Sequence, residues 1–257
     1  LQMVSASEVG DFVFCPASYS LQKSFQVSQD PESNVELIWD EKRILLDRFS
    51  DYQKTGELNK TFTEEEKERI GEIPNGFIEI FKSKILQESK RNKKVKIFFN
   101  GEKNFSGVPD YWLSNNFNFV TEEKFSRHSS KKEELSSPYP NHKAEVLSQI
   151  FELQDLKATK GYVVYWLWNF ERVEYKNKTS TDYRLQKVKL FEIEPDENNK
   201  KYYENIIAQI RKFNKDKDSV FNIKSLFASK CVNCGVSQFC FHKTGRISKL
   251  RLPYNKE

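Results

Sequence analysis

Residues 107–124 read GVPDYWLSNNFNFVTEEK, and this stretch decides which fold the rest of the chain is expected to build. Two short β-like runs flank an Asn-rich segment, a pattern that predicts a hairpin. Asp110 lies at the end of the first run, and Glu122 and Lys124 lie near the end of the second. Residues i and i+2 of a strand project to the same side, so Glu122 and Lys124 are expected on one face and Glu123 on the other. If the strands pair, two carboxylates and an ammonium come close together.

This group of charges predicts a site for a divalent cation. Close carboxylates repel each other, and a hard cation such as Mg²⁺ or Mn²⁺ relieves the repulsion by binding one or two of them with water and a phosphate oxygen. The cation acidifies a bound water, and a lysine can orient that water or offset developing charge. Gly107 would let the backbone bend before Asp110. The alternative is a solvated hairpin without a cation site, because charged strands often contain the pattern D…E-x-K by chance.

The segments around the hairpin predict a mixed α/β fold. Helices are expected in residues 4–24 (a short helix capped by Ser5 or Ser7), 36–52, the segment after the capping box of Thr63 and Glu66, 75–88, 143–157 and 197–213, and further strands at 95–99, 162–168 and 185–193. The order hairpin, helix, strand predicts a mixed sheet with helices packed on it. We expect one compact unit with an N-terminal helical segment (3–94), a core (95–215) and a C-terminal segment (216–257).

Four cysteines predict a metal centre that joins the two ends of the chain. Cys15 stands alone, whereas Cys231, Cys234 and Cys240 form a C-x2-C-x5-C cluster. Zinc sites are usually built from two short pairs, so this pattern of one plus three favours an iron–sulfur cluster. Two disulfides, four separate structural thiols, or a zinc site that uses His242 in place of Cys15 are the alternatives.

Composition limits the function classes. The chain has 257 residues, 37% of them hydrophobic and 14% aromatic, which is enough to close a core. No apolar run is long enough to span a membrane and no secretory signal is visible, so a cytoplasmic protein is expected. The net charge of +5 permits an acidic partner such as nucleic acid. A basic patch that could contact phosphates follows the cysteine cluster and comprises Lys243, Arg246, Lys249 and Arg251.

These motifs together resemble the PD-(D/E)xK nuclease superfamily in its RecB-like branch. The resemblance rests on G-V-P-D at 107–110, E-E-K at 122–124 and a following helix that carries Gln149. The order of the cysteines is similar to that of iron–sulfur RecB-like exonucleases, and the size is closest to the CRISPR-associated exonucleases. The resemblance covers nearly the whole chain and implies a restriction-endonuclease-like core, a mixed sheet flanked by helices, between terminal segments joined at the four cysteines.

The resemblance also implies residue roles. Asp110 and Glu122 would bind Mg²⁺ or Mn²⁺ with the main-chain carbonyl of Glu123, Lys124 would be the catalytic lysine, and Gln149 would position the lysine and the DNA. The four cysteines would hold a [4Fe–4S] cluster as a structural clamp.

The chain departs from the family pattern at two places. Leu153 stands where the family's Q-x3-Y motif has tyrosine, and no histidine precedes His128. Any of three acidic residues could replace the family's early histidine, namely Glu36, Asp40 and Glu41.

The resemblance predicts a metal-dependent DNA nuclease, an exonuclease that prefers single-stranded ends and trims spacer precursors beside a CRISPR integrase. A phage-encoded, defence or repair nuclease would use the same chemistry. The alternatives are a non-catalytic DNA-binding or scaffold subunit that keeps the nuclease fold, and a zinc-stabilised binding module.

Overall fold

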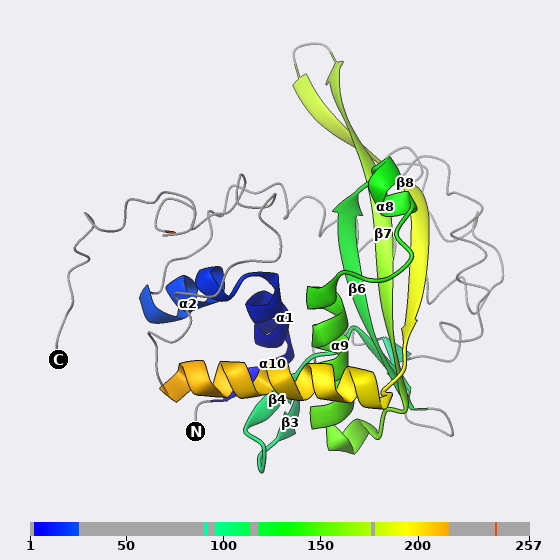
Figure 1. Ribbon diagram of the computed structural model, residues 1–257. Coiled ribbons are helices and arrows are strands. Elements are labelled where there is room, and N and C mark those ends of the chain that lie inside the picture. Colours follow the sequence, from blue (N-terminus) through cyan, green and yellow to red (C-terminus); the bar gives the residue numbers. More distant parts are fainter. Residues whose placement is uncertain are drawn as a thin grey trace.

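A five-stranded sheet with a helix lying across it forms the centre of the molecule (Figure 1). The computed structural model describes residues 3–25, 90–91, 96–113, 118–175, 178–215 and Cys240. Three expected helices, at 36–52, after Thr63 and at 75–88, lie outside the described residues. None of the described helices is both long and apolar enough to cross a membrane.

The larger sheet has the strand order β2-β5-β6-β7-β8. Its strands are β2 (Lys90–Arg91), β5 (Tyr111–Leu113), β6 (Phe119–Arg127), β7 (Lys160–Tyr175) and β8 (Lys178–Ile193). Only β6 and β7 pair in parallel, so the chain must cross over between them. The crossover contains α8 (Ser130–Glu133), α9 (Pro140–Glu152) and a 3-10 turn (Gln154–Leu156). The sheet is therefore mixed, as predicted.

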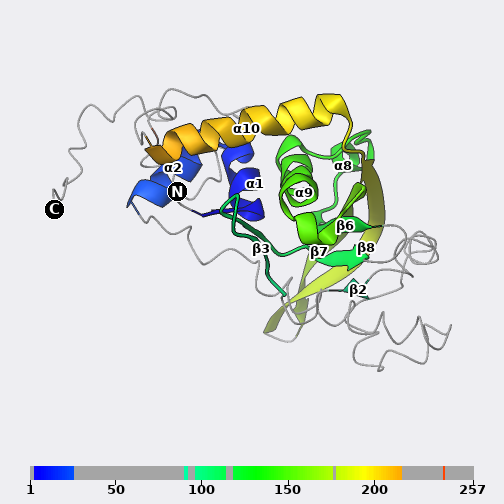
Figure 2. The same ribbon diagram turned by 90° about the horizontal axis from the view of Figure 1, so that it is seen from below.

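A smaller sheet ties the beginning of the described chain to its middle. It has the order β1-β4-β3 and consists of β1 (Val4–Ser5), β4 (Phe105–Gly107) and β3 (Phe98–Asn100). β1 pairs in parallel with β4, with Val4 opposite Phe105. The chain then enters α1 (Ala6–Phe14), which lies beside α9 on the side away from the large sheet (Figures 1 and 2).

The predicted helix near the start of the chain is confirmed as two helices. Ser5 caps α1, because its Oγ accepts from the Glu8 backbone N–H at 3.2 Å while the Glu8 carboxylate accepts from the Ser5 N–H at 2.8 Å. Cys15 is extended (φ −161°, ψ 105°), as expected for a residue before proline, and Pro16 opens α2 (Pro16–Phe25).

Helix α9 packs on the sheet through most of the apolar stripe that its sequence predicts, which comprises Ala144, Leu147, Ile150 and Phe151, and only Phe151 of these is partly exposed. Ala144, Leu147 and Ile150 are buried, and the helix begins three residues earlier than expected because Pro140 fits its first turn. Gly161 on β7 allows the close approach, since a Cβ there would collide with Val146 and lie 2.9 Å from Ile150 Cδ1. The last helix of the described residues, α10 (Glu197–Lys215), runs across α9 and α1 (Figure 2).

The predicted hairpin is confirmed as the antiparallel pair of β5 and β6, with one correction. Asp110 does not end the first strand but lies in the link that leads from β4 of the small sheet to β5 of the large one. Gly107 ends β4, and a Cβ on it would lie 2.8 Å from Leu153 Cδ1. A side chain at this position would therefore displace the end of Leu153, and the backbone bend that the sequence predicts at Gly107 stays a prediction.

Strands β7 and β8 are longer than predicted, with 16 residues each. β6 pairs with β7 only as far as Trp168, and from there β7 pairs with β8 alone. A two-stranded ribbon therefore projects from the sheet (Figure 1).

Candidate cation site on strand β6

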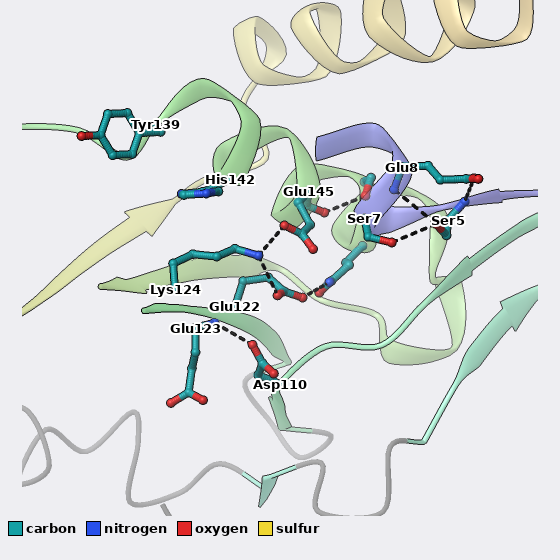
Figure 3. A network of polar contacts seen from close by, with 12 residues as sticks. Ser5, Ser7, Glu8, Asp110, Glu122, Glu123, Lys124, Tyr139, His142 and Glu145 are labelled. Atoms are coloured by element: carbon teal, nitrogen blue, oxygen red, sulfur yellow. Dashed lines mark hydrogen bonds and ion pairs between the residues drawn. The ribbon is translucent and has the colours of Figure 1, made fainter. Parts of the chain in front are cut away.

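Asp110 and Glu122 lie opposite each other, as the hairpin predicts. Tyr111 pairs with Thr121, and one further step in this antiparallel register sets Asp110 beside Glu122. The Asp110 backbone N–H donates to the Thr121 carbonyl at 3.1 Å, and the Asp110 carboxylate accepts from the Glu123 N–H at 2.7 Å. These two bonds fix the aspartate carboxylate against β6 (Figure 3).

The Glu122 carboxylate is buried, with 4% of the residue exposed, and two side chains contact it. Gln149 of α9 donates from Nε2 to Glu122 Oε1, and Lys124 Nζ lies 3.4 Å from Glu122 Oε2 (Figure 3). Burial raises the pKa of Glu122 well above its ordinary value, and the nearby Glu145 carboxylate raises it further while Lys124 opposes the change. Without a cation, this site therefore penalises the ionised form of Glu122.

Lys124 bridges two carboxylates from different elements. Its Nζ lies 2.5 Å from Glu145 Oε2 on α9 and 3.4 Å from Glu122 Oε2 on its own strand. Burial acts to lower the pKa of Lys124, but the charges of Glu145 and Glu122 outweigh it, so the pKa is raised and the lysine is a cation at neutral pH. The ammonium therefore lies between the strand and the helix.

The two glutamates of the E-E-K string face opposite sides of the sheet, as strand geometry predicts. Glu123 is buried and its carboxylate accepts from Trp166 Nε1 at 3.0 Å. Its side chain is thus held by the opposite face, and only its main chain borders Asp110.

Two acidic residues that the sequence analysis did not single out complete the site. Glu145 stands four residues before Gln149, so both lie on one face of α9. This spacing is the feature of the sequence that could have identified Glu145 as part of the site. Asp11 comes from α1, and burial followed by the charge of Glu145 raises its pKa to about 6. Helix α1 comes close to Glu145 at Gly10, where a Cβ would lie 3.4 Å from Glu145 Oε2. Nothing in the local sequence around Asp11 indicates this placement.

The donor atoms fit a hydrated divalent cation. Mg²⁺ typically takes one or two carboxylates and keeps several waters, and Asp110 with Glu122 supplies two hard oxygen ligands. Within the described ranges, no three His, Cys, Asp or Glu residues form a group that could hold a metal ion. The buried Gln149 Oε1 has no hydrogen-bond partner in the part of the chain that the structure describes, and a water ligand could donate to it.

The structure describes one of the two places at which the chain departs from the family pattern. Leu153, at the position of the family's tyrosine, is buried at the end of α9 against Gly107, so its role here is packing. Glu36, Asp40 and Glu41 fall outside the described residues.

Two of the four cysteines lie together. Cys15 and Cys240 belong to one small buried cluster with Ala17 and Leu21, and the Ser18 backbone N–H donates to Cys15 Sγ at 3.4 Å. Cys231 and Cys234 lie outside the described residues, as do the basic residues Lys243, Arg246, Lys249 and Arg251. The four-cysteine centre stays a prediction.

Comparison with known proteins adds little to the site. No protein-family model and no curated protein matches the chain. Among solved structures, the chain is similar to the crystal structure of SSO0001, with 13% sequence identity and a TM-score of 0.40 over 93% of this chain and 86% of that one. At this TM-score the likeness carries no information about function.

Proposed function

We propose that this protein is a metal-dependent nuclease that hydrolyses phosphodiester bonds of DNA. The observation that supports the proposal best is the convergence of Asp110, Glu122, Lys124 and Gln149, from the β5 link, strand β6 and helix α9, on one side of the sheet. These are the four residues to which the PD-(D/E)xK resemblance gives catalytic roles. The mixed sheet with α9 packed on it is consistent with such a core.

Asp110 and Glu122 would hold the Mg²⁺ or Mn²⁺, together with the main-chain carbonyl of Glu123. When bound, the cation supplies an acidified water and offsets charge on the phosphate. A bound cation would also offset the cost of burying Glu122 as an anion, because it places a positive charge beside the carboxylate.

Lys124 would act on the phosphate and the attacking water. Its ammonium has three donors, of which Glu145 and Glu122 take two. The remaining donor can bind a phosphate oxygen and offset the charge that grows there in the transition state. Gln149 holds the Glu122 carboxylate in place through Nε2. A 1 Å displacement of such a carboxylate is enough to lower the rate substantially.

The substrate and cofactor assignments rest on the resemblance. We propose single-stranded DNA ends as the substrate, with trimming of spacer precursors beside a CRISPR integrase as the biological setting, and a [4Fe–4S] cluster on the four cysteines as a structural clamp.

The test is degradation of end-labelled single-stranded DNA in the presence of Mn²⁺. Wild type should degrade it, whereas Glu122→Gln and Lys124→Met should each lose at least about a hundredfold in rate, the scale of a lost electrostatic contact. Glu197→Gln is the matched control, because it removes the same charge from a side chain that is 79% exposed on α10. Equal cleavage by all four proteins would overturn the proposed site. Tight DNA binding without cleavage by wild type would favour the scaffold alternative.

A further inference from the structure

We infer that Glu145 is a positioning residue that holds the ammonium of Lys124 away from Glu122 and thereby keeps the Glu122 carboxylate available to a divalent cation. The inference rests on the proposed function, since it concerns the same cation. It extends that function to a residue outside the four that the resemblance assigns.

The two contacts of Lys124 are unequal. The 2.5 Å distance from Lys124 Nζ to Glu145 Oε2 is that of a short, charge-assisted hydrogen bond. The 3.4 Å distance to Glu122 Oε2 is near the outer limit for a hydrogen bond. Glu145 is therefore the main partner of the lysine, although Glu122 is only two residues away on the same strand.

The surroundings of Glu145 support this contact. The side chain is 13% exposed and that of Lys124 is 22% exposed, so the pair is partly screened from water and stronger than a surface ion pair. Helix α1 borders the carboxylate on another side at Gly10. Helix α9 thus fixes two charged groups of β6, because Glu145 binds Lys124 and, one turn later, Gln149 binds Glu122.

Loss of the Glu145 charge has a specific consequence for the cation. With Glu145 neutral, Glu122, 3.4 Å away, becomes the nearest carboxylate to Lys124 among the described residues, and the charge of Asp110 also acts on the lysine. The ammonium would then pair with Glu122, and a cation would have to displace it. Cation affinity should therefore fall because the lysine competes for Glu122. This decrease adds to the one caused by the loss of a negative charge near the site.

The experiment is titration calorimetry of the full-length protein with MnCl₂, without DNA. Glu145→Gln should weaken Mn²⁺ binding about tenfold, the factor that corresponds to one hydrogen bond to a charged group. In a Lys124→Met background the same substitution should weaken binding less than about threefold, because the ammonium that Glu145 restrains is gone. Glu197→Gln controls for the change in net charge. Glu145→Asp, which keeps the charge on a shorter side chain, should fall between wild type and Glu145→Gln and serves if Glu145→Gln does not fold.

The outcomes separate the inference from the function on which it rests. Equal weakening by Glu145→Gln in both backgrounds would mean that Glu145 acts only as a nearby negative charge, and would overturn the inference alone. Unchanged affinity in Glu145→Gln would do the same. Absence of saturable Mn²⁺ binding by wild type would overturn the proposed cation site and the inference together.

Discussion

Gly161→Ala should destabilise the protein, because helix α9 rests directly on this glycine. A methyl group at position 161 would collide with Val146 Cγ1 and lie 2.9 Å from Ile150 Cδ1. The end of the isoleucine can rotate away, but valine is branched at Cβ and has little freedom in a helix. Overpacking of this kind costs about 1–3 kcal/mol, and the stiff valine places the expected cost near 2 kcal/mol. For a chain of this length that corresponds to a fall in Tm of about 4–8 °C.

Thermal unfolding followed by circular dichroism measures the effect, with Gly101→Ala as the control. Beyond the two neighbouring residues, no heavy atom of the described chain lies within 4 Å of the Cβ position at Gly101, so that variant should change stability by less than about 0.5 kcal/mol. Val146→Ala should partly rescue Gly161→Ala, with a coupling of about 1 kcal/mol, because it removes the colliding methyl. A Gly161→Ala protein as stable as Gly101→Ala would refute the packing of α9 on β7 described above.

Two further predictions concern Asp11 and the cysteines. The pKa of Asp11 in the folded protein, about 6, lies above its ordinary value of 3.8, so the native state binds the extra proton between these values and loses stability as the pH rises through them. In a chelating buffer, Asp11→Asn should therefore stabilise the protein by up to about 3 kcal/mol at neutral pH and by almost nothing near pH 4, as urea denaturation at both pH values would show. An equal gain at both pH values would contradict this prediction. Anaerobically purified protein should contain about four iron atoms per chain. The Cys15→Ala variant should lose this iron, whereas the control variant Ser18→Ala should keep it. Metal analysis that finds zinc in wild type would contradict the iron–sulfur prediction.

The sequence alone predicts the structure correctly where the interactions that determine it are local. The alternating pattern around Glu122 and Lys124 predicts the strand and both of its faces, including the separation of Glu123, because side-chain direction follows from strand geometry alone. The apolar stripe that contains Leu147 predicts the buried face of α9. Ser5, which with Ser7 was a candidate cap, predicts the start of α1 for the same reason.

Contacts between distant segments could not be predicted in this way. Asp11 reaches the site only because α1 lies beside α9, and no periodicity within residues 6–14 indicates that partner. The position of Asp110 outside a strand also depends on tertiary structure, since β4 and β5 belong to different sheets. The lengths of β7 and β8 exceed the prediction because their outer parts pair with each other and need no apolar face toward a core.

The pairing of β1 with β4 has a consequence for synthesis on the ribosome. Val4 cannot pair in a sheet until Phe105 has been synthesised. At the usual translation rate of about 5–20 residues per second, this takes about 5–20 s. Helix α1 is without its packing partner for longer, because α9 is translated after β4. During that interval apolar residues of α1 that end up buried, among them Ala6, Val9 and Phe12, are exposed on the nascent chain. The α1 segment should therefore be available to chaperones until α9 has been made.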